Sequence, residues 1–195
     1  MPESRSSAQD KKYLRMACRL ARRAAGRTSP NPQVGAVIVQ RGKVVGTGYH
    51  RFAGGDHAEI AALKRAGARA RGATLYISLE PCSHQGRTPP CTGALVRAGI
   101  NDVVCGTMDP NPLVAGRGFR QLRRAGIRVR IGVLEQECRA LIEAFAKYIT
   151  RRVPFVTLKL AATLDGRIPA ASGDARWISG ERSRRAVHRL RNEID

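Results

Sequence analysis

The sequence has few aromatic residues, few acidic residues and no long apolar run. Phe, Trp and Tyr make up 5% of its 195 residues, which argues against the base-stacking surface that binds single-stranded nucleic acid. No apolar stretch approaches the ~18–20 residues that a membrane span requires. The polar segment 1–12 also lacks the apolar core of a secretion signal. These absences predict a cytoplasmic protein with no membrane partner.

The scarcity of acids leaves the chain strongly basic. It has 15 Asp and Glu against 35 Lys and Arg, a net charge of +20. Such a charge fits a polyanionic partner or a phosphorylated substrate. The charges are scattered along the chain, however, and a general compositional bias toward arginine explains them equally well. We favour the bias, so nucleic acid is disfavoured as a partner.

Cysteine is present in an odd number, which argues against a disulfide framework. Cys18, Cys105 and Cys138 lie in apolar or amphipathic stretches, where a free cysteine behaves as a small hydrophobic residue. Cys82 and Cys91 lie in a loop-like segment downstream of a histidine. These two cysteines require a chemical explanation.

Strand and helix patterns alternate from residue 11 to residue 150, after a predicted loose tail over residues 1–10. Apolar and β-branched runs predict strands over 34–39, 43–48, 73–79, 102–107 and 127–131. Helical spacing predicts helices over 11–25, 57–66, 92–98, 119–125 and 134–150. Asp56 is the expected N-cap of the helix at 57. This alternation predicts an α/β sandwich.

The composition changes near Arg151. The segment 151–195 predicts a strand over 153–160, a turn at Asp165–Gly166 and a basic helix over 181–191. About forty residues are too few to fold without help. We therefore predict a domain over 11–150, followed by a segment that packs on it, self-associates or belongs to a further domain.

The chemistry is concentrated in His57-Ala58-Glu59 and in the segment from Pro81-Cys82 to Cys91. One imidazole and two thiolates suit Zn²⁺ and leave a fourth position open, which is typical of a catalytic site. Zn²⁺ lowers the pKa of water toward neutrality. We predict that His57, Cys82 and Cys91 bind one zinc ion per chain.

Glu59 follows His57 by two residues, on the expected first turn of a helix. Its carboxylate can reach a water at the metal without binding the metal, and can then move protons to the substrate. The combined pattern is similar to the H-x-E with P-C-x-x-C signature of zinc deaminases. Eight residues separate the cysteines here rather than two. A structural zinc with His84 as a fourth ligand remains the alternative.

Together with the motifs below, His57-Ala58-Glu59 and the segment from Pro81 to Cys91 make the chain resemble the bacterial bifunctional riboflavin-biosynthesis deaminase–reductases. The resemblance also rests on Asn31-Pro32-Gln33-Val34-Gly35, on Gly48-Tyr49-His50, on the long insert between the cysteines and on the loop 109–118. In the last third it rests on Leu158-Lys159-Leu160-Ala161, Leu164-Asp165-Gly166-Arg167 and Trp177-Ile178.

The resemblance implies a cytidine-deaminase-like three-layer α/β/α sandwich with a mixed central sheet, followed by the first elements of a dihydrofolate-reductase-like α/β domain. It also implies a reaction. The substrate is 2,5-diamino-6-ribosylamino-4(3H)-pyrimidinone 5′-phosphate, and the products are 5-amino-6-ribosylaminouracil 5′-phosphate and ammonia. Candidate contacts to this small phosphorylated pyrimidine are Asn31, His50, His84 and Arg87. The family further suggests a homo-oligomer.

The reductase half of the family uses NADPH, and only its first elements are represented. By resemblance, Ala161 and Trp177 match NADP contacts and Arg191 matches a substrate contact, whereas Ala175 replaces a serine that binds substrate. The remaining strands of the cofactor site are not in the sequence, so we expect no reductase activity from this chain.

Two other functions stay open on the sequence. One is a deaminase of tRNA adenosine or free cytosine, which the positive charge favours and the long cysteine insert disfavours. The other is a basic RNA-binding module with a structural zinc, for which Glu59 would be dispensable.

Overall fold

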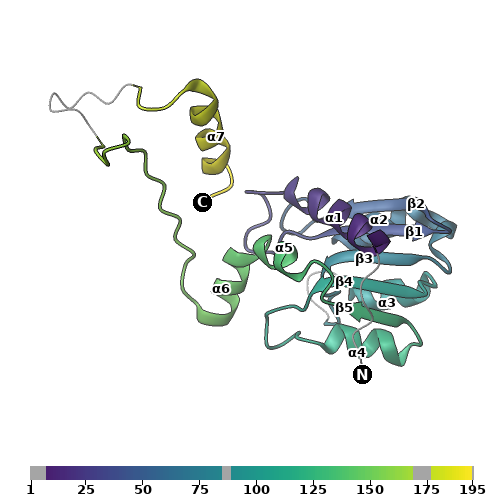
Figure 1. The fold of residues 1–195 in the computed structure, drawn as a ribbon. Helices are drawn as coiled ribbons and strands as arrows, with labels where there is room; N and C mark the ends of the chain where they lie inside the picture. Colours follow the sequence, from purple (N-terminus) through teal and green to yellow (C-terminus); the bar gives the residue numbers. More distant parts are fainter. Residues whose placement is uncertain (1–7, 85–88, 169–176, 195) are drawn as a thin grey trace. The chain divides into compact units, whose positions relative to one another are not determined.

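The computed structural model describes residues 8–84, 89–168 and 177–194 (Figure 1). The chain divides into two units, Met1–Pro154 and Phe155–Asp195. This division lies a few residues after the boundary predicted at 150/151. Within the described residues, no helix is long and apolar enough to cross a bilayer.

A mixed five-stranded sheet forms the centre of the first unit (Figure 1). Its strands are β1 (Gly35–Gln40), β2 (Lys43–Tyr49), β3 (Thr74–Leu79), β4 (Asp102–Thr107) and β5 (Arg128–Ile131). They are ordered β2-β1-β3-β4-β5. β1 is antiparallel to both neighbours, whereas β3, β4 and β5 are parallel to one another. Each strand lies within two residues of its predicted span, and the mixed sheet is confirmed.

Helices cover both faces of the sheet. They are α1 (Ala8–Arg22), α2 (Ala58–Ala66), α3 (Cys91–Arg97), α4 (Arg117–Arg124), α5 (Glu135–Ala140) and α6 (Glu143–Arg151), with a short 3₁₀ helix η1 (Gly67–Ala70) after α2. Ala62, Leu95 and Leu122 pack from α2, α3 and α4 on one face. Leu14 of α1 and Cys138 of α5 pack on the other. The three-layer α/β/α sandwich is therefore confirmed.

A glycine in β2 sets how closely α2 approaches the sheet. A Cβ on Gly48 would lie 2.2 Å from the carbonyl oxygen of Ala58 and 2.5 Å from the nitrogen of Ala62. No side chain larger than hydrogen fits there. The close contact fixes the first turn of α2, which carries His57 and Glu59.

Two predicted boundaries in the first unit are wrong. α1 begins at Ala8, inside the predicted tail, because Asp10 is buried, pairs with Arg130 and accepts a hydrogen bond from the Tyr76 hydroxyl. The predicted helix 134–150 is two helices, α5 and α6. Between them Ile142 is buried and has a φ of −122°. Packing of this β-branched residue overrides the local helical preference.

The second unit contains helix α7 (Glu181–Arg191), as predicted, and a turn in which the Gly166 N–H donates to the Thr163 carbonyl. The predicted strand 153–160 is wrong, because the described residues there form no strand. A strand requires a neighbour to satisfy its backbone hydrogen bonds. Leu158 is 80% exposed, so the described segment presents no packed face.

Candidate active site

The predicted zinc ligands meet where strand ends and helix starts converge in the first unit. His57 is the N-cap of α2, and Cys91 is the first residue of α3. Cys82 lies in the loop that follows β3. The carboxyl ends of parallel strands are the usual position of ligand sites in α/β sheets. Residues far apart in sequence are thus brought to one edge of the sheet.

One nitrogen of His57 faces both sulfur atoms. The His57 Nδ1 lies 3.6 Å from the Cys82 Sγ and 3.3 Å from the Cys91 Sγ. The three potential ligand atoms all lie within 4.8 Å of one another, and no fourth Asp, Glu, His or Cys of the described chain joins this group. Three converging N and S donors fit a tetrahedral zinc site with one open position.

The pKa values of the two thiols are shifted in opposite directions. Hydrogen bonds from Cys91 and His57 hold the pKa of Cys82 at about 4, well below its usual value. The pKa of Cys91 is raised, because it donates to Cys82 and is buried. The Cys91 N–H also donates to the Cys82 Sγ at 3.4 Å. A divalent cation would displace the thiol proton of Cys91, as metal binding to thiols requires.

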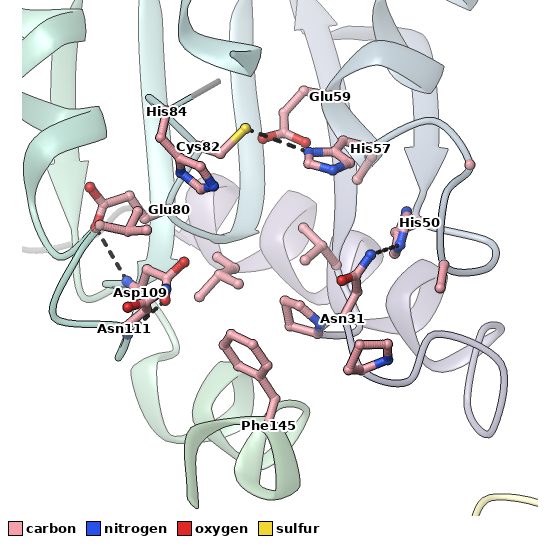
Figure 2. A pocket seen from close by; sticks show the side chains of 18 of the residues that line it. Asn31, His50, His57, Glu59, Glu80, Cys82, His84, Asp109, Asn111 and Phe145 are labelled. Carbon is pink, nitrogen blue, oxygen red and sulfur yellow. Dashed lines mark hydrogen bonds between the residues drawn. The ribbon is translucent and has the colours of Figure 1, made fainter. Parts of the chain in front are cut away.

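Glu59 is buried beside this cluster, on the first turn of α2. Its carboxylate points between Cys82 and His57 (Figure 2). Burial, and then the negative charge of Cys82, raise the pKa of Glu59 to about 7. A carboxyl group with a pKa near neutrality can both accept and return a proton.

His50 and Asn31 form a second polar group in the cavity wall. The Nδ1 of His50 lies 3.0 Å from the carbonyl oxygen of Asp56, so Nδ1 carries the proton. Nε2 therefore accepts from the Asn31 side-chain amide at 3.0 Å. Burial lowers the pKa of His50. This network turns the amide oxygen of Asn31 away from His50, toward the cavity (Figure 2).

A cavity of about 440 Å³ opens in front of Glu59 and His57. Its wall includes Pro30, Pro32 and Val114, and Phe145 of α6 lies across the cavity from the cluster (Figure 2). Of the described residues that line it, none is lysine or arginine. The volume is in the range of small-molecule sites.

The loop after β4 contributes two lining residues, Asp109 and Asn111, which lie in the 109–118 loop named above but were not predicted as site residues. The Asn111 N–H donates to the Asp109 Oδ1 at 2.8 Å. Burial raises the pKa of Asp109 to about 6. An acid with a raised pKa that borders a cavity is a functional candidate. The Pro-rich sequence Asp109-Pro110-Asn111-Pro112 was the available signal.

The other predicted residues have different outcomes. His84 lines the cavity but is not in the ligand cluster, and Arg87 lies outside the described residues. Asp56 does not cap α2, because its carboxylate pairs with Lys64 at 2.6 Å.

The three predicted reductase positions all lie in the second unit. Ala161 is partly exposed, and Arg191 is exposed at the end of α7. The ring of Trp177 is 71% exposed and carries the guanidinium of Arg184 at 4.1 Å from its centroid.

Comparison with known proteins decides the family. A model of the cytidine and deoxycytidylate deaminase zinc-binding region matches residues 7–107. The chain belongs to this deaminase family. The RibD C-terminal domain matches residues 154–195. The matched zinc-binding region contains His57, Glu59, Cys82 and Cys91.

The resemblance to the riboflavin-biosynthesis proteins is also confirmed. The chain is 54% identical to the riboflavin biosynthesis protein RibD of Aquifex aeolicus, over 94% of the chain and 52% of that protein. It is 50% identical to RibD of Escherichia coli, over 94% and 50%. It thus spans about half the length of the curated relatives it matches.

Solved structures agree with the sequence comparison. RibD of Acinetobacter baumannii superposes with a TM-score of 0.87 at 47% identity, covering 95% of this chain and 52% of that one. The diaminohydroxyphosphoribosylaminopyrimidine deaminase/5-amino-6-(5-phosphoribosylamino)uracil reductase of Thermotoga maritima superposes with a TM-score of 0.89 at 46% identity, covering 94% and 53%.

Proposed function

We propose that this chain hydrolytically deaminates 2,5-diamino-6-ribosylamino-4(3H)-pyrimidinone 5′-phosphate, giving 5-amino-6-ribosylaminouracil 5′-phosphate and ammonia. The observation that carries the proposal is the convergence of His57, Cys82 and Cys91 around one point, with the buried Glu59 beside them. The identity to RibD proteins across this region supports the choice of substrate.

His57, Cys82 and Cys91 are the proposed zinc ligands. When bound, the ion supplies Lewis acidity and makes water a nucleophile near neutral pH. The donor set fits zinc because it combines one imidazole nitrogen with two sulfurs, one of which has a lowered pKa that favours the thiolate. The N–H of Cys91, at the start of α3, stabilises the negative charge on Cys82.

Glu59 is the proposed proton carrier. It lies beside the cluster but is not part of the ligand group, so its carboxylate is free to take a proton from the attacking water. It would pass this first proton to the ring nitrogen, where the proton stays in the uracil product. It would then move the remaining hydroxyl proton to the amine as the carbonyl forms and the C–N bond breaks, so that the amine departs as ammonia. Burial excludes bulk water that would otherwise exchange this proton.

The substrate ring is proposed to lie between the cluster and Phe145. Asn31 would present its amide oxygen as an acceptor to N–H groups of the ring, since its amide nitrogen is already bonded to His50. Asp109 and Asn111 would face the substrate from the other side of the cavity. His84 and Arg87 remain proposed contacts to the phosphorylated pyrimidine.

Deamination is proposed to be carried by the first unit, because the cluster, Glu59 and all the described cavity residues precede Pro154. Ala161, Trp177 and Arg191 belong to the reductase-like segment and have no proposed part in deamination.

The test is ammonia release from the diaminopyrimidinone ribosyl phosphate by purified, zinc-loaded protein. Glu59→Gln keeps the size of the side chain and removes its basicity. We expect that variant to retain zinc and lose about 10²–10⁴-fold in kcat. Glu135→Gln, at a half-exposed residue in an i,i+4 pair with Arg139, is the matched control. Equal turnover by Glu59→Gln would contradict the proposal, and release from tRNA adenosine or cytosine alone would reassign the substrate.

A further inference from the structure

We propose that Glu80 is a positioning residue, which fixes the loop bearing Asp109 and Asn111 against the metal-binding segment. The inference rests on the proposed function, because it assigns to that loop the far wall of the substrate cavity. Glu80 borders the same cavity, but the hydrogen bonds of its carboxylate go to backbone N–H groups of the loop and of α4 and not to the zinc-ligand cluster. Its role would be to set the distance between the two sides of the cavity.

The Glu80 carboxylate accepts hydrogen bonds from four backbone N–H groups. Oε2 accepts from Asp109 at 3.2 Å and from Gly116 at 2.9 Å. Oε1 accepts from Gly118 at 2.9 Å and from Phe119 at 3.4 Å. These donors lie at the start of the loop, at its end and in the first turn of α4. A single side chain thus binds both ends of the loop, and Figure 2 shows its contact with Asp109.

Glu80 is 4% exposed, and no ion pair with lysine or arginine is found for it in the described chain. A buried carboxylate is costly unless its oxygens are hydrogen-bonded. Here the balancing positive charge comes from N–H dipoles, two of them in the first turn of α4, where the helix dipole favours an anion. Glu80 is therefore a buried structural carboxylate and not a solvated surface acid.

The position of Glu80 in the sequence connects this anchor to the cluster. Only Pro81 separates it from Cys82. α4 also contacts this segment directly, since a Cβ on Gly118 would lie 2.1 Å from the Pro81 carbonyl oxygen. Movement of the loop relative to Cys82 therefore requires the Glu80 hydrogen bonds to break.

The anchored loop is ordered within itself. The Asn111 N–H donates to Asp109 and the Leu113 N–H donates to the Asn111 Oδ1 at 3.0 Å. These hydrogen bonds fix the conformation of the loop, whereas Glu80 fixes the position of the loop relative to the segment that bears Cys82. A site whose parts are displaced by about 1 Å loses on the order of 10²-fold in activity. Glu80 is therefore expected to act on substrate binding through Asp109 and Asn111.

Glu80→Gln is the decisive variant. All four partners are donors, and an amide nitrogen cannot accept from them. In Glu80→Gln, the side-chain NH2 group would therefore face two of the backbone N–H groups, and those two hydrogen bonds would be lost. Glu80→Asp is the second variant, which keeps the charge but is one methylene shorter, and serves if Glu80→Gln does not fold. Glu135→Gln is again the matched surface control.

Two readouts are measured on the full, zinc-loaded chain. The first is amide hydrogen exchange, in which we expect faster exchange at Asp109, Gly116, Gly118 and Phe119 but unchanged protection in β3 and β4. The second is steady-state ammonia release. We expect KM to rise about 10–100-fold while kcat stays within about 3-fold and zinc content is unchanged, with a smaller rise for Glu80→Asp.

The outcomes separate this inference from the proposed function. Unchanged exchange in the loop, or an unchanged KM in an active protein, would overturn the positioning role. A loss confined to kcat together with lost zinc would also overturn it, since Glu80 would then support the metal. If wild type releases no ammonia, the proposed function fails, and the exchange measurement alone still decides whether Glu80 holds the loop.

Discussion

The similarity to RibD proteins extends over both units of the chain, but the two units differ in how they bury their apolar residues. In the first unit Leu75 and Leu122 are fully buried between the sheet and its helices. In the second, no residue of 155–168 or 177–194 is buried, and Leu158 and Leu164 are largely exposed. Sequence similarity indicates which fold a segment can adopt. Burial of its apolar side chains shows whether neighbouring helices and strands cover them in this structure.

The largest expected contrast between the units is in stability. Leu75→Ala removes a fully buried side chain of β3 and should lower the free energy of unfolding by about 2–5 kcal/mol. Leu158→Ala removes an 80% exposed side chain and should change it by less than about 0.5 kcal/mol. Denaturant titration of both variants measures the difference. Comparable losses would mean that the second unit is packed in solution.

A smaller effect is expected at Asp109, in the first unit. Its folded-state pKa of about 6 lies above the usual 3.8, so the folded protein binds the proton more tightly than the unfolded chain. The stability due to protonated Asp109 is therefore present below about pH 4 and is lost as the pH rises through 6. Asp109→Asn should abolish this dependence and stabilise the protein by about 1–2 kcal/mol at pH 7.

Melting curves of wild type and Asp109→Asn between pH 4 and pH 7 provide the measurement. Parallel curves would show that Asp109 titrates normally. A gain in stability together with weaker substrate binding would identify Asp109 as a functional acid held in an unfavourable environment.

The smallest effect is expected from removing the second unit. A protease should cut the exposed segment 155–168 before it cuts the sheet, because the described residues there make few packing contacts. The remaining first unit should melt within the ~2–4 °C that corresponds to 1 kcal/mol. Calorimetry before and after cleavage tests this. A larger fall in Tm would show that the second unit stabilises the first.

The sequence predicted the fold well where local pattern and tertiary packing agree. The centres of two strands, Leu75–Ile77 and Val103–Cys105, are apolar, as in buried parallel strands, and the sheet formed where expected. The prediction was wrong at Ile142, where core packing breaks a periodic helix, and at 153–160, where a strand pattern has no neighbour. Hydrophobic periodicity indicates which secondary structure a segment prefers, whereas tertiary packing determines which one it forms.

The metal cluster was predictable because residue type and spacing carry its chemistry. The role of Glu80 was not, since a glutamate before Pro81 and Cys82 gives no sign that four N–H groups from another loop will meet it. Asp109 was difficult for a similar reason, because its burial depends on how that loop folds back on β3. Such residues become visible only when the topology places β4 beside β3.

The most direct test of a catalytic rather than structural zinc is a crystal structure of the zinc-loaded chain with anomalous data at the zinc edge. We predict one zinc per chain, bound by the His57 Nδ1 and by the sulfur atoms of Cys82 and Cys91, with a non-protein fourth ligand facing Glu59. A fourth protein ligand such as His84, or a zinc bound elsewhere, would contradict a hydrolytic site.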